Sequence, residues 1–103
     1  MKLSPFYSSL VNVASELDQR GAKGLVLFNR FIQPEIDIDK MTSKTKASFD
    51  DPIGFSHALR WIALLSDNLN LDLAASGNIR TADDVIKQLL AGASVIQVAS
   101  VLY

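Results

Sequence analysis

The sequence predicts an α/β protein in which helices connect the strands of a parallel sheet. Three observations support this fold class. Segments with helical apolar spacing alternate along the chain with short, continuous apolar runs, which are typical of buried strands. Glycines and helix-capping residues separate the two kinds of segment. Helix and strand units repeated in this way build parallel sheets through right-handed crossovers.

The first helix and strand are predicted within residues 8–28. One helical face carries Leu10, Val13, Ala14 and Leu17. Ser8 or Ser9 is suited to cap the start of this helix, and Gly21 to end it. The run GLVLF at 24–28 follows. We expect it to form a strand that is buried on both faces.

A second helix and strand are predicted within residues 55–75. The apolar residues of this helix, at helical spacing, are Phe55, Leu59, Ile62, Leu65 and Leu69. The run LDLAA at 71–75 then predicts another strand of the same sheet.

The third helix has the clearest boundaries. Thr81 and Asp84 have the spacing of a capping box, and Gly92 stands where a left-handed residue would end the helix. The predicted buried stripe consists of Ala82, Val85, Ile86 and Leu89. The last strand is expected in SVIQVA at 94–99.

We expect the chain to form a single domain, residues 1–103. One long connection, at about 30–54, interrupts the alternation of helices and strands. It has no helical stripe, and connections of this length are usually lids, binding loops or disordered segments. The alternating residues 36–39 (IDID) predict a small strand outside the main sheet.

Composition narrows the functional classes. Ten basic and eleven acidic side chains give a net charge of -1, and no run of like charge is long enough to follow a nucleic acid backbone. The chain has no cysteine, which excludes disulfides and thiolate chemistry within it. We find no signal-peptide core and no membrane span. A cytoplasmic protein that binds neither nucleic acid nor membranes is expected.

The candidate binding residues follow the predicted strands. Parallel α/β folds bind ligands at the carboxyl ends of their strands, and here those ends carry Asn29, Ser76-Gly77-Asn78 and Ala99-Ser100. Ser-Gly-Asn suits a phosphate, because glycine lets the backbone approach an anion and asparagine tolerates the left-handed conformation. Residues 101–103 resemble the first turn of the short helix that often completes such a phosphate site.

The terminal run AASGNIRTADDVIKQLLAGASVIQVASVLY resembles the last strand-helix-strand unit of flavin-binding (β/α)8 barrels. Together with KLSPF near the start, LVLFNRF at 25–31 and LRWIALL at 59–65, it is most similar to the dihydroorotate dehydrogenase family. The resemblance covers nearly the whole chain but only the last part of the family's fold. It implies the C-terminal portion of a TIM barrel, with strands five to eight and the helices between them.

The resemblance also implies roles for individual residues around an FMN cofactor. Lys2 matches a lysine that contacts the flavin ring, and Asn29 matches an asparagine that binds the pyrimidine substrate. Gly77 and Asn78, after Ser76, match the first phosphate turn, and Ala99 with Ser100 matches the second. In this chain Asn78 replaces the family's second glycine. The family's general base, a cysteine or serine, lies on a loop outside this chain, so no catalytic residue is assigned.

These features lead to two functional hypotheses. In the first, the chain is the C-terminal part of an FMN-dependent oxidoreductase that converts dihydroorotate to orotate in pyrimidine biosynthesis, and the isolated chain is inactive. In the second, it is a non-catalytic half-barrel that binds a phosphate-containing ligand or has a structural role. In either case the open sheet edges of a partial barrel predict self-association, with a homodimer as the expected form.

Overall fold

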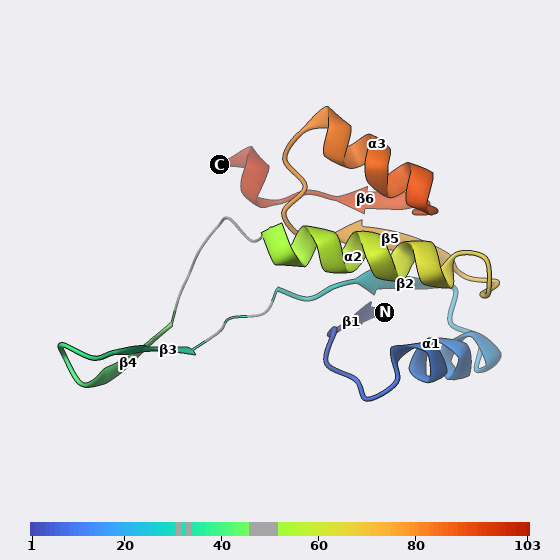
Figure 1. Ribbon diagram of the computed structural model, residues 1–103. Coiled ribbons are helices and arrows are strands. Elements are labelled where there is room, and N and C mark those ends of the chain that lie inside the picture. Colours follow the sequence, from blue (N-terminus) through green and yellow to red (C-terminus); the bar gives the residue numbers. More distant parts are fainter. Residues whose placement is uncertain (31, 33, 46–51) are drawn as a thin grey trace.

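The main feature of the structure is a four-stranded parallel sheet (Figure 1). The computed structural model describes residues 1–30, 32, 34–45 and 52–103. The sheet has the order β1-β2-β5-β6, formed by β1 (Lys2–Leu3), β2 (Gly24–Leu27), β5 (Asp72–Ser76) and β6 (Val95–Gln97). The intervening helices are α1 (Leu10–Gln19), α2 (Pro52–Leu65) and α3 (Ala82–Ala91), and a 3-10 turn, η1 (Ser100–Leu102), follows β6.

The order of strands in the sheet is their order along the chain, and every neighbouring pair is parallel. This confirms the predicted α/β class. A (β/α)8 barrel is built in the same way, from consecutive parallel strands joined by helices. The arrangement is therefore consistent with a partial barrel.

The helices pack against one face of the sheet. Leu25 and Leu27 of β2 point to that face and are 1% and 0% exposed. The buried core formed with the helices includes Leu3, Leu10, Ala14, Ala58, Ile62, Leu65, Leu73 and Ala75.

The prediction that residues 24–28 are buried on both faces is wrong for part of the strand. Alternate residues of a strand point to opposite faces, and Gly24 and Val26 are only partly buried. No second layer covers their face among the described residues, as Figure 1 shows. The continuous apolar run thus predicted the strand correctly, but the described residues cover only one of its faces.

The first helix has the predicted boundaries. Ser9 caps α1, and its Oγ accepts a hydrogen bond from the Asn12 N–H at 3.4 Å. Gly21 follows the helix with φ of +91°, the left-handed conformation that favours glycine. Both signals are local in sequence, which is why they could be located without the structure.

The third helix starts as predicted but presents a different face. Ile86 and Leu89, assigned to the buried stripe, are 53% and 46% exposed, and Ala82 is exposed as well. The buried residue is Gln88, whose Nε2 donates to the Phe55 carbonyl of α2 at 3.4 Å. Val85 of the predicted stripe does pack against the core. The apolar spacing therefore predicted the helix and the burial of Val85 correctly, but the packing of α3 on α2 leaves the other three members of the stripe exposed.

The capping box of α3 is complete. Thr81 Oγ1 accepts from the Asp84 N–H at 3.1 Å, and Asp84 Oδ2 accepts from the Arg80 and Thr81 N–H groups at 3.1 and 3.0 Å. The hydrogen bonds from the Arg80 and Thr81 amides hold the pKa of the Asp84 carboxyl below its ordinary value of 3.8. These bonds favour the ionised carboxylate.

This depressed pKa predicts a pH dependence of stability. Asp84 stabilises the fold fully above its unfolded-state pKa, and the contribution is lost as the pH falls below 3.8 through the folded-state value. Asp84→Asn should therefore be less stable than wild type at neutral pH, and the two should converge at strongly acidic pH. Urea unfolding of both proteins across this range measures the effect. A difference in unfolding free energy that does not depend on pH would contradict the assignment.

The long connection contains an antiparallel hairpin that stands apart from the main sheet. Its strands are β3 (Pro34–Asp37) and β4 (Thr42–Thr45), which form a second sheet. Asp37 pairs with Lys44 across the hairpin, and this ion pair, with the Lys40 N–H, lowers the pKa of the Asp37 carboxyl. A strand outside the main sheet is confirmed, but only its first two predicted residues, Ile36 and Asp37, lie in β3, and residues 38–39 belong to the turn. In Figure 1 the hairpin extends away from the sheet.

Within the described residues, none of the helices combines the length and the apolar character that crossing a membrane requires.

Candidate functional site

The two predicted phosphate turns lie at the same edge of the sheet. Gly77 and Asn78 directly follow β5, and Ala99 and Ser100 come just after β6. These strands are parallel neighbours, and the last residue of one, Ser76, is the register partner of the last residue of the other. Both turns therefore leave the sheet at its carboxyl edge, on adjacent strands, as expected.

The first turn has the backbone conformation predicted for an anion-binding loop. Gly77 has φ of +125° and Asn78 has φ of +49°. A Cβ atom at Gly77 would lie 3.7 Å from the Gly54 carbonyl oxygen, an ordinary contact. Glycine is therefore favoured at position 77 by the positive φ and not by a lack of room for a Cβ atom. Asparagine tolerates the left-handed region better than most other residues, so its place in this turn is compatible with the fold.

The backbone amides near these turns divide into two groups. The capping box already engages the N–H groups of Arg80 and Thr81 through Asp84. Among the described residues, no hydrogen bond is formed by the N–H groups of Gly77 and Ser100. An anion at this edge would therefore be bound by the two strand-end turns, and the start of α3 would contribute little.

Lys2 brings a positive charge to the first turn. It lies on β1 as the register partner of Val26, and its Nζ is 3.4 Å from the Ser76 Oγ at the end of β5. The lysine side chain thus reaches across β2 on the face of the sheet opposite the helices. Lys2 and Ser76, which come from distant parts of the sequence, are thus brought together.

Asn29 occupies the carboxyl end of β2. Its N–H donates to the Leu3 carbonyl at 2.7 Å, and its side chain is exposed. The preceding residue, Phe28, donates its N–H to the Ser76 carbonyl at 3.1 Å. All the site residues predicted from the sequence therefore lie at or near the carboxyl ends of the four parallel strands.

Arg80 is a polar residue of this edge that is close enough in sequence to the first turn to meet a phosphate, but a surface position was expected for it and it was not assigned to the site. Its Nε donates to the Asn78 Oδ1 at 3.0 Å, which places a guanidinium beside the first turn. The available signal was its position two residues after Asn78. Because arginine is long and exposed there, its direction could not be predicted from spacing alone.

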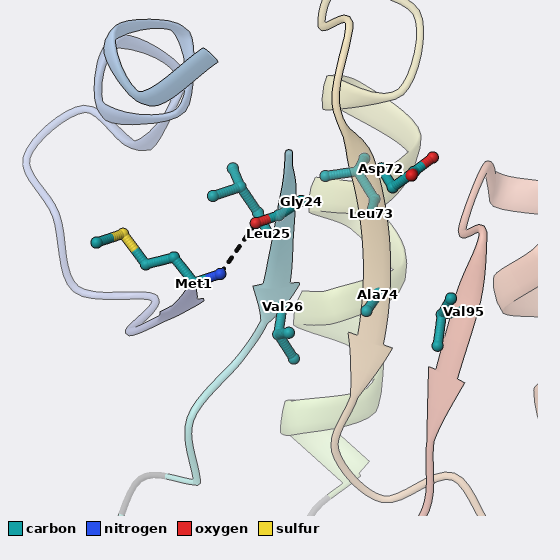
Figure 2. Close-up of a pocket in the computed structure, with 8 residues that line it drawn as sticks. All are labelled: Met1, Gly24, Leu25, Val26, Asp72, Leu73, Ala74 and Val95. Carbon is teal, nitrogen blue, oxygen red and sulfur yellow. Dashed lines mark hydrogen bonds between the residues drawn. The ribbon is translucent and has the colours of Figure 1, made fainter. Parts of the chain in front are cut away.

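A separate hollow lies on the same sheet face, towards the amino ends of the strands. Its volume is about 300 Å³, and its lining includes Val26, Ala74 and Val95 (Figure 2). This hollow is apolar and lies away from the carboxyl-edge turns, so it does not coincide with the predicted site. No group of three potential His, Asp or Glu metal ligands occurs in the described part of the chain.

Comparison with known proteins finds no protein-family model that matches the chain. Among curated proteins, the chain is similar to the catalytic subunits of dihydroorotate dehydrogenase B (NAD(+)) from three bacteria. The identity is 33% to the protein of Shouchella clausii and 29% to those of Halalkalibacterium halodurans and Bacillus mycoides. Each match covers 97% of this chain and 33% or 34% of the relative.

The predicted resemblance to the dihydroorotate dehydrogenase family is therefore confirmed. The chain spans about a third of the length of the curated relatives it matches. This share is consistent with a C-terminal portion of a dihydroorotate dehydrogenase-like protein and with the partial barrel described above.

Proposed function

We propose that this chain supplies the FMN phosphate-binding part of an oxidoreductase of the dihydroorotate dehydrogenase type. The observation that carries the proposal is the placement of the Gly77-Asn78 and Ala99-Ser100 turns on adjacent parallel strands at one edge of the sheet. The similarity to dihydroorotate dehydrogenase B catalytic subunits supports it independently.

The residues at this edge fit a phosphate group. Gly77 and Ser100 have N–H groups that no described residue engages, and backbone N–H groups converging at strand ends bind anions well. Asn78 and Ala99 complete the two turns. Ser76 adds a hydroxyl.

In this assignment the Lys2 ammonium would stabilise electron density on the flavin ring, and the Asn29 amide would bind the pyrimidine. When bound, FMN supplies the hydride acceptor that converts dihydroorotate to orotate in pyrimidine biosynthesis. The proton is removed by a general base that this chain does not contain.

Because the general base and much of the ring pocket are not among these residues, the isolated chain should be inactive. Incubation with FMN, dihydroorotate and an electron acceptor is expected to give no turnover above a blank with free flavin alone. Turnover above that blank would contradict the assignment of the base to another part of the enzyme.

Cofactor binding itself is tested by comparing FMN with riboflavin, which lacks the phosphate. We expect FMN to bind more than tenfold more tightly, because charge-assisted hydrogen bonds to a phosphate contribute about 1.5–3 kcal/mol each. Flavin fluorescence titrations measure both affinities. Equal affinities, or no binding of FMN, would contradict the proposed phosphate site.

The alternative is a non-catalytic half-barrel that binds a phosphate-containing ligand or has a structural role. The N–H groups of Gly77 and Ser100, which no described residue engages, suit any phosphate group and keep this alternative open. Competition separates the two hypotheses, since a generic phosphate site would be occupied equally well by inorganic phosphate and by FMN. An FMN site should prefer the whole cofactor.

A further inference from the structure

The first proposed phosphate turn is followed at once by a charged side chain. Arg80 is the only charged residue in the segment 76–81, SGNIRT. Its Nε donates to the Asn78 Oδ1 at 3.0 Å, and its side chain is exposed. Ile79, between the two, is 3% exposed and anchors the turn in the core. A contact within the turn itself thus holds the guanidinium beside it.

The bond to Asn78 positions the guanidinium without neutralising it. An amide oxygen is an uncharged acceptor, and the bond uses one of the five N–H donors of an arginine. Guanidinium N–H groups match the oxygens of a phosphate in pairs, so arginine is well suited to phosphate sites. The Asp84 carboxylate, by contrast, accepts from the backbone N–H groups of Arg80 and Thr81 and thereby caps α3.

The charges near the two turns leave a phosphate in need of a cation. All five residues assigned to the phosphate turns are uncharged, namely Ser76, Gly77, Asn78, Ala99 and Ser100. A phosphate monoester carries a charge of about −2 at neutral pH. Asp83 and Asp84, in the first turn of α3, add negative charges that repel an anion. Lys2 is assigned to the flavin ring, so Arg80 is the side chain placed to balance the phosphate.

We propose that Arg80, positioned by the Asn78 side chain, binds the cofactor phosphate and makes the site selective for a phosphorylated flavin. This inference rests on the proposed function, since it adds a side chain to the phosphate site formed by the two turns. Hydroxyl and backbone N–H groups bind neutral and charged oxygens, whereas a guanidinium favours the charged ones. Asn78 acts through Arg80, because it restricts a flexible side chain to the turn before the ligand arrives.

Arg80→Gln tests the role of the charge, and Arg20→Gln is its matched control. Arg20 lies between α1 and β2, at the amino edge of the sheet, where its exposed guanidinium pairs with Glu16. Each variant loses one exposed positive charge. We expect Arg80→Gln to bind FMN about tenfold more weakly than wild type and riboflavin equally well. Arg20→Gln should keep both affinities. Flavin fluorescence titrations measure the affinities, and circular dichroism checks that both variants fold.

Asn78→Gly tests the positioning of Arg80. Asn78 has φ of +49°, which glycine adopts readily, so the variant keeps the turn and loses the side chain. In a double-mutant cycle, Arg80→Gln should weaken FMN binding about tenfold when Asn78 is present, and no more than about threefold in the Asn78→Gly background. Riboflavin binding should show no coupling. Equal losses of FMN affinity in the two backgrounds would refute the positioning role of Asn78.

The same titrations distinguish a failure of this inference from a failure of the proposed function. If the wild-type chain binds FMN no more tightly than riboflavin, the phosphate site itself is refuted, and the role of Arg80 with it. If wild type prefers FMN and Arg80→Gln keeps the full preference, the two turns bind the phosphate alone and only the role of Arg80 is wrong. A parallel loss of riboflavin binding in Arg80→Gln would also refute that role, because riboflavin has no phosphate.

Discussion

Gly92→Ala is expected to lower the free energy of unfolding by about 3 kcal/mol, because backbone strain and a steric clash add together. Gly92 has φ of +120°, a conformation that a residue with a Cβ rarely adopts. An added Cβ would lie 2.4 Å from the Cβ and 2.6 Å from the Oγ of Ser66. The Ser66 Cβ cannot move away by rotation, since it is attached directly to the backbone at the end of α2.

Gly21→Ala is the matched control for this prediction. Gly21 also follows a helix with a positive φ, +91°, but nothing lies within 4 Å of the Cβ position. The Gly21→Ala variant therefore measures the cost of the positive φ without a steric clash, and we expect it to lower the free energy of unfolding by about 1 kcal/mol. Urea unfolding measures the free energy of unfolding that each variant loses. The additional loss in Gly92→Ala is the cost of the steric clash between the end of α3 and the end of α2. If the two variants lost equal stability, the close approach of Gly92 to Ser66 would be refuted.

The features of the fold that could be predicted from the sequence are those encoded by local signals. Ser9, the Thr81–Asp84 capping box and the two glycines after α1 and α3 each act within a few residues. They set where helices start and end, and the apolar runs between them set the strands. The parallel order of the sheet then follows from the alternation of helices and strands.

The features that could not be predicted depend on contacts between distant segments. Apolar spacing in α3 suggested Ile86 and Leu89 as core, but packing on α2 buries Gln88. The Oε1 of Gln88 has no hydrogen-bond partner among the residues that the structure describes. Gln88 has no sequence signal that distinguishes it from an exposed glutamine. A glutamine buried in this way indicates that the orientation of α3 is set by its neighbours.

In the candidate site, too, the features set by local sequence could be predicted, and those that depend on distant contacts could not. The strand ends that carry Asn29, Gly77 and Ser100 were predictable, because an apolar run ends where polar and small residues begin. The contact of Lys2 with Ser76 was not predicted, since 74 positions separate them in the sequence. The contact of Arg80 with Asn78 needed the structure, because it depends on the turn conformation.

Ser100→Asp is expected to lower the affinity for FMN by roughly a hundredfold. Ser100 begins η1, directly after Ala99 at the second proposed phosphate turn. A carboxylate at about 5 Å from a phosphate repels it by about 3 kcal/mol at the effective dielectric constant of a protein surface, and each 1.4 kcal/mol is a factor of ten in affinity. Flavin fluorescence titration measures the loss directly.

Ser100→Asn is the control, because asparagine has nearly the same shape as aspartate without the charge. It keeps the backbone N–H and should bind FMN within a few-fold of wild type. Riboflavin affinity should be the same in all three proteins, since that ligand has no phosphate to repel. Equal effects of the Asp and Asn variants, or a loss of riboflavin binding in parallel, would mean that Ser100 contacts another part of the ligand or none of it. The phosphate would then have to be held by Gly77 and Asn78 without the second turn.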